Sequence, residues 1–163
     1  MSYTNADGVY VLTGVDQGAI RPNGTNDNAV RRSLVIDIPD FTAIPATVTS
    51  ANISAMDASI PANSVIVGAT LVMITGATSG GLATLDVGTY TAAASAVSAA
   101  GIISAAALTA IDAAGEVVRG AGTLVSGTTS TGTAPVYVAA KYNTAAFTAG
   151  SARLFVQYIV TGI

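Results

Sequence analysis

The chain has 163 residues, of which 51% are hydrophobic and only 9% are charged, and its net charge is −3. This length fits one domain, but an average soluble domain carries about 25% charged residues, so these few cannot cover the outside of a solitary monomer. We therefore expect much of the surface to face other protein. The absence of Cys and His excludes disulfides, thiolate nucleophiles and histidine acid–base catalysis.

Residues 1–29 are predicted to form an extended N-terminal arm. The segment is rich in turn residues, and 9–12 is its only run that resembles a strand. Such a segment has too few apolar side chains to fold alone. We expect it to be either loosely ordered or laid on a neighbouring subunit. The candidate contact residues within it are Val9, Tyr10, Val11 and Leu12.

The remainder, 30–163, is predicted to form a single β domain that opens with a strand at 32–38. In this strand Leu34, Ile36 and Ile38 alternate with polar residues, and Pro39 ends the run. A weaker strand is predicted over 47–54, where large apolar residues are few.

The domain is expected to be organised around an antiparallel hairpin. The uncharged, β-branched run 64–75 predicts a central strand that is buried on both faces. In the following strand, 82–90, Leu85 and Val87 should face the core while Thr84 and Asp86 meet water. The glycine-rich run GATSGG between the two strands is typical of a reversal of the chain.

The last third of the chain predicts one helix and three further strands. The Ala-rich run 104–113 favours a short helix, and a short strand follows at 123–125. The strand 136–142 alternates and should be half exposed, whereas the final strand, 152–160, carries large apolar residues on both faces. Phe155 and Ile159 on its second face are candidates for subunit contact; coverage of both faces within one sandwich is an equal alternative.

Together these elements predict an all-β fold. About eight strands, few helices and frequent Gly, Ser and Thr punctuation indicate an antiparallel β-sandwich or jelly roll with one short helix and the N-terminal arm.

No catalytic, cofactor or metal site is expected. The nine acidic residues are mostly scattered near turns, and only Asp37 and Asp86 on predicted strands could assemble a carboxylate pair of the glycosidase type. We favour the alternative that both are solvated residues on outer strand faces.

Neither nucleic acid nor a membrane is an expected partner. Six basic residues leave no cationic stripe for a phosphate backbone. The uncharged stretch 87–111 has the length of a membrane span, but it is mostly Ala, Ser, Thr and Gly without flanking basic anchors. The start, MSYTNADG, has neither the basic n-region nor the apolar h-region of a secretory signal.

The order of segments from residue 60 to 163 is distinctive. A PAN turn is followed by the strand VIVGATLV, the return TLDVGTY, the segment GIISAAAL, then VYVAA, and finally FTAG and LFVQYI. In this order and composition the chain resembles the small head-decoration, or cement, proteins of tailed bacteriophages. The resemblance implies a β-sandwich or jelly-roll module, often a homotrimer, on the outside of an icosahedral capsid over junctions between capsomers.

If the resemblance holds, the partners are further copies of the chain and the major capsid protein, and the protein is made in the host cytoplasm before it joins the virion. Two other classes stay open. One is a different virion component, such as a fibre base, head spike or tail part. The other is a carbohydrate-binding or adhesive jelly-roll module.

Overall fold

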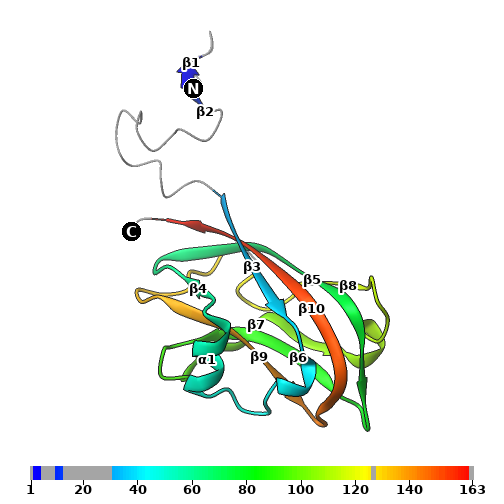
Figure 1. Cartoon of the computed structure of the whole chain (residues 1–163). Helices are drawn as coiled ribbons and strands as arrows, with labels where there is room; N and C mark the ends of the chain where they lie inside the picture. Colours follow the sequence, from blue (N-terminus) through cyan, green and yellow to red (C-terminus); the bar gives the residue numbers. More distant parts are fainter. Residues whose placement is uncertain (1, 5–9, 13–30, 126–127, 162–163) are drawn as a thin grey trace.

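The computed structural model describes residues 2–4, 10–12, 31–125 and 128–161. Most of this chain forms two four-stranded antiparallel sheets that pack face to face (Figure 1). The strand order is β3-β10-β5-β8 in one sheet and β4-β9-β6-β7 in the other. The arrangement is therefore a β-sandwich.

The element bounds are as follows. The first sheet contains β3 (Arg31–Ile38), β10 (Phe147–Val160), β5 (Ser64–Ser79) and β8 (Val117–Arg119). The second contains β4 (Ser59–Ile60), β9 (Val136–Asn143), β6 (Thr84–Tyr90) and β7 (Ala96–Ala107). The helical segments are α1 (Ser50–Met56) and two 3-10 turns, Phe41–Ala43 and Leu108–Ala110. In the N-terminal segment, β1 (Ser2–Thr4) pairs with β2 (Tyr10–Leu12).

The eight strands of the sandwich pair as one long antiparallel ribbon that is folded over on itself. β3 pairs with β10, β4 with β9, β5 with β8 and β6 with β7, so the pairs are nested along the chain. Pairing of β10 with β5, and of β6 with β9, joins them into two sheets. Nested pairing of eight strands in two sheets is the jelly-roll topology. The predicted all-β jelly-roll sandwich is confirmed.

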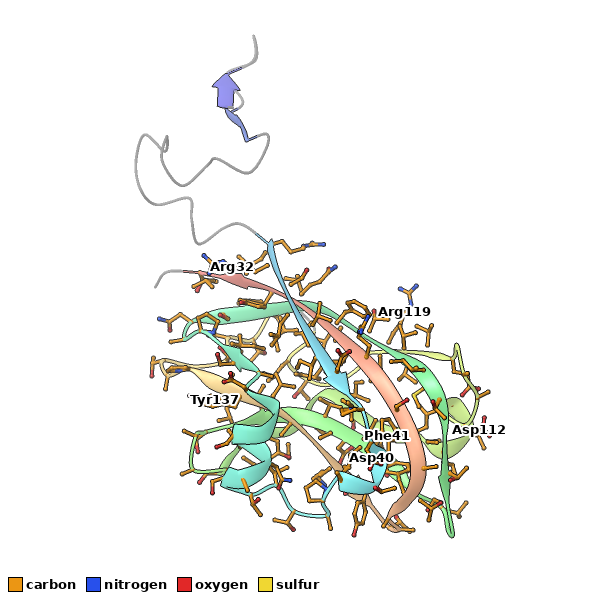
Figure 2. All side chains as sticks on the ribbon, viewed as in Figure 1. Arg32, Asp40, Phe41, Asp112, Arg119 and Tyr137 are labelled. Carbon is orange, nitrogen blue, oxygen red and sulfur yellow. The ribbon has the colours of Figure 1, made fainter. Side chains whose placement is uncertain are left out.

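The core lies between the two sheets, where alternate side chains of each strand point inward. Both sheets contribute fully buried residues, among them Ile66, Leu71, Leu154, Leu85, Val87 and Val138. At one end Phe41 packs edge-on against Phe147, with ring centroids 5.3 Å apart. Figure 2 shows Phe41 between the layers of the sandwich.

The predicted central hairpin is wrong. β5 pairs with β10 and β8, while β6 pairs with β7 and β9, so these two strands belong to opposite sheets. β5 continues through Ser79, and the chain crosses between the sheets only after it. The expected burial is also reversed. β5 exposes Ile74 on its outer face (55%), whereas in β6 both Leu85 and Asp86 are buried. Asp86 is covered because the bulged strand β7 and the side chains of Asn143 and Lys141 contact it.

The segment predicted to be a helix is mostly strand, and one segment predicted to be a strand is a helix. Residues 104–107 belong to β7, and only one 3-10 turn follows at Leu108–Ala110, because pairing with β6 overrides the helix propensity of the alanines. The expected strand at 47–54 is instead α1. The Asn52 side chain accepts the backbone N–H of Thr49 at 2.9 Å, a capping arrangement that its Thr-x-x-Asn spacing could have indicated.

The other strand predictions have mixed outcomes. The strands at 32–38 and 136–142 are present as β3 and β9, and Tyr137 and Lys141 of β9 are partly exposed as expected. The final strand is present as β10 but begins at Phe147, since the expected FTAG turn is part of it. The prediction of a short strand at 123–125 is wrong, because these residues form a turn.

Candidate functional site

The two sheets differ in what lies on their outer faces. Outside the β4-β9-β6-β7 sheet, Val48 and Ile53 from the α1 region pack with Tyr90 and Ala139, and all four residues are buried. Outside the β3-β10-β5-β8 sheet, Val35, Phe155 and Val117 stay exposed at 52%, 37% and 56%. This second surface, which we call the open face, is the stronger candidate for contact with another protein.

The open face consists of the outward side chains of four paired strands. In one row across the sheet, Val35 stands opposite Phe155, Phe155 opposite Thr70, and Thr70 opposite Arg119. The next row contains Asp37, Arg153, Val72 and Val117 in the same strand order. Since side chains in register on one face of a sheet are neighbours, apolar and charged groups alternate over this surface.

The structure places the sequence-predicted contact residues in two regions. Phe155 and Ile159 both point outward from β10 on the open face, with Ile159 opposite Arg31 and Val65. Tyr10, Val11 and Leu12 form β2, while Val9 lies outside the described residues. Contact of any of these residues with a partner stays a prediction.

Sequence reasoning missed three members of the open face: Val35, Val117 and Arg119. β8 was not expected as a strand, so Val117 and Arg119 had no assigned face. Val35 had a usable signal, because it occupies an outward position in the alternation of 32–38.

An exposed ion pair lies on the open face. Arg153 Nε is 2.6 Å from Asp37 Oδ1, and Arg153 Nη2 is 3.3 Å from Asp37 Oδ2. The hydrogen bond from Arg153 lowers the pKa of Asp37 and raises the pKa of Arg153 itself. Exposed pairs of this kind add little to stability, so its effect is to orient two charges on the surface.

A second charged group is buried on the other sheet. Asp86 faces a bulge in β7, because Leu85 pairs with Ala106 while Val87 pairs with Ile103. The freed Ala105 N–H donates to Asp86 Oδ1 at 2.7 Å, and Asn143 Nδ2 donates to Asp86 Oδ2 at 2.7 Å. Lys141 Nζ lies 3.2 Å from Asp86 Oδ2. Burial opposes ionisation, but these donors outweigh it, and the pKa of Asp86 is lowered.

Asp37 and Asp86 do not form a carboxylate pair. They lie on different sheets, and each binds its own cation, Arg153 and Lys141 respectively. The expectation that Asp86 is solvated is wrong, since it is only 7% exposed. Its role in the structure is to accept the hydrogen bond of the Ala105 N–H at the bulge and to hold Lys141 and Asn143 in place.

Among residues 2–4, 10–12, 31–125 and 128–161, no three acidic side chains are grouped so that they could hold a metal ion. In the part of the chain that the structure describes, no helix has the length and hydrophobicity to span a bilayer.

Replacing Asp86 with asparagine is expected to lower the free energy of unfolding at neutral pH by about 1–2 kcal/mol, because donors aimed at a carboxylate lose their acceptor. The stabilisation by Asp86 exists above the pKa of an unfolded Asp, about 3.9, and is lost as the pH falls through the lower folded-state value. Wild type and Asp86→Asn should therefore converge in acid. Denaturant unfolding at several pH values measures this.

The matched control is Asp37→Asn, which removes the other paired carboxylate from an exposed position. It should change stability little at any pH. A constant difference between wild type and Asp86→Asn from neutral to acid pH would contradict the role assigned to Asp86.

The nested pairing and the two four-stranded sheets place the chain among jelly-roll β-sandwich proteins. A similar solved structure is the capsid of Ralstonia phage GP4, which matches with a TM-score of 0.52 and 20% sequence identity. The match covers 81% of this chain and 85% of that chain, so it includes most of the sandwich. At this identity the likeness concerns the fold. No protein-family model and no curated protein matches the sequence.

Proposed function

We propose that the chain is a structural virion protein that decorates and stabilises the outside of an icosahedral phage capsid. The observation that carries this proposal is the jelly-roll fold shared with a chain of the GP4 capsid over most of both lengths. The low charge content, 9%, and the exposed apolar residues of the open face favour a protein that works through contacts with other proteins.

The proposed mechanism needs neither catalysis nor a cofactor. Each copy buries apolar area against the shell, which stabilises the contact by roughly 25 cal/mol per Å². Symmetry repeats the contact over many copies, so individually weak contacts hold the shell closed. The proposed partners are the major capsid protein and further copies of the chain, and the proposed location is the capsid exterior after synthesis in the host cytoplasm.

The isolated chain is expected to form a symmetric homotrimer. The physical reason is the small number of charged residues, which leaves apolar surface that association would cover. Light scattering coupled to size exclusion measures the mass of the particle. A soluble species of monomer mass at micromolar concentration would contradict the expectation.

Deleting residues 1–29 is expected to leave the sandwich folded and to reduce occupancy on the capsid. Among the described residues the sandwich core begins at position 36, and the arm is expected to add little to it. In the proposal the arm supplies contact with the shell. The measurement mixes full-length and truncated protein with undecorated shells, and compares occupancy and the temperature at which the shells open.

Unchanged occupancy by the truncated protein would move the attachment to the sandwich itself, with Phe155 and Ile159 as the next residues to test. Failure of the full-length protein to bind or stabilise shells would contradict decoration. Electron microscopy of complete particles with a labelled chain would then identify a fibre, spike or tail position, and a glycan array would test the carbohydrate-binding alternative.

A further inference from the structure

We infer that the open face binds an acidic protein surface and that Arg119 receives a carboxylate of this partner. The inference rests on the proposed function, in which the partner is the capsid shell. It names the chemistry of the contact and the side chains that make it.

The first support is the distribution of charge. The outward positions of the four strands hold Arg31, Arg119 and Arg153, with Asp37 as their only carboxylate. The rest of the described chain has the opposite balance, with two basic and five acidic residues: Arg32, Lys141, Asp40, Asp57, Asp86, Asp112 and Glu116. A protein of net charge −3 thus presents one positively charged face. Such a face is complementary to an acidic partner.

The second support is a hollow of about 340 Å³ beside Arg119. Thr70, Phe155 and Gln157 line it together with Gly68, which has no side chain to fill it. At Gly68 a Cβ atom would lie 3.5 Å from Gln157 Oε1, so the space is open directly beside the glutamine. The hollow is therefore large enough to admit a side chain from another molecule.

The lining groups suit a carboxylate. Arg119 forms no salt bridge with any residue in the described part of the chain. Figure 2 shows its side chain projecting outward from β8. Gln157 Oε1 lies toward Gly68 and accepts from Arg31 Nη1 at 3.4 Å, so the acceptor atom of Gln157 already has a donor. The Arg119 guanidinium and the Thr70 hydroxyl line this space and can donate to an Asp or Glu carboxylate, and the Phe155 ring offers an apolar wall for its methylene groups.

The third support is the apolar rim. Val35, Phe155 and Val117 are exposed close to the charged positions of the same sheet. Arginine and aromatic residues among apolar side chains are typical of binding surfaces. Two copies meeting through this same face would bring arginines onto arginines, and like charges oppose that arrangement. An acidic surface with apolar neighbours fits better.

The test uses the full-length protein and undecorated shells of the phage that encodes it. We expect Arg119→Glu to weaken binding about tenfold or more, and Arg119→Lys to weaken it less, because lysine keeps the charge but loses the planar fork. Phe155→Ser should also weaken binding. Val97→Ser is the matched control, since Val97 is 47% exposed but lies on β7 of the other sheet. Raising the ionic strength should weaken wild type more than Arg119→Glu.

Melting temperatures show whether each variant is folded. If Arg119→Glu does not fold, the comparison of shell binding uses Arg119→Lys instead. Equal shell binding by wild type and the Arg119 variants would overturn this inference and leave the proposed function intact. No shell binding by wild type would overturn both. Loss of self-association in Arg119→Glu with unchanged shell binding would assign the open face to contacts between copies, and would also overturn the inference.

Discussion

Replacing Leu71 with alanine is expected to lower the free energy of unfolding by about 2–5 kcal/mol. Leu71 is fully buried at the middle of β5, where it stands opposite Leu154 of β10 and Val118 of β8. The substitution removes apolar contacts and leaves a cavity that two hydrogen-bonded sheets cannot close by moving together. Thermal or denaturant unfolding followed by circular dichroism measures the loss.

Leu82→Ala provides the control, because it deletes the same atoms at a site that is 83% exposed. Its effect should stay within about 0.5 kcal/mol. Similar losses at Leu71 and Leu82 would contradict the position of the core between the two sheets.

Gly88→Ala is expected to destabilise the fold by about 3 kcal/mol, although it adds a single methyl group. Gly88 lies within β6, where the bulged strand β7 comes so close that a Cβ atom would overlap the backbone of Ser98 and Ala99. Backbone atoms cannot rotate away as side chains do, so one of the two strands must shift and disturb the pairing. The midpoint of thermal unfolding reports the effect.

The matched substitution is Gly80→Ala, since a Cβ atom at Gly80 would meet nothing within 4 Å. It should leave the unfolding midpoint nearly unchanged. If Gly88→Ala were equally harmless, β7 would have to lie farther from β6 than the structure has it.

Small residues and one buried carboxylate shape the pairing of β6 with β7. The chain has 17 glycines, and in the second sheet Gly88 allows β7 to approach β6 closely at Ser98 and Ala99. A separate bulge in β7, opposite Asp86, frees the Ala105 N–H, and Asp86 accepts its hydrogen bond. A buried charge that looks like a functional candidate in the sequence is thus explained by the local geometry of one strand pair.

The covering of the sheets decides where a partner can bind. The α1 region buries part of the outer face of one sheet through Val48 and Ile53, so that part of the face is covered within the chain. The open face keeps Phe155 and Val35 exposed. Of the two alternatives for the outward residues of the last strand, subunit or partner contact is the one that an exposed Phe155 favours.

The sequence by itself determined the class of fold and several of its strands. The runs that became β3 and β9 alternate apolar and polar residues with a period of two. This period reflects the geometry of an extended backbone and does not depend on which strand is the neighbour. These patterns, together with the glycine and serine residues between the predicted strands, were therefore enough to predict a jelly-roll sandwich.

Only the tertiary structure decided which strands pair, which faces are covered and where the helix lies. β5 and β6 are adjacent in sequence but join opposite sheets, because β5 pairs with the distant strands β8 and β10, while β6 pairs with the following strand β7 and the distant strand β9. The alanines at 105–107 form a strand because β6 offers hydrogen bonds there, and this outweighs a propensity of a few tenths of a kcal/mol per residue. Arg119 and Phe155 become neighbours on one face only when β8 and β10 flank β5. A relation between residues 36 positions apart along the chain is a property of sheet register, which local sequence patterns do not contain.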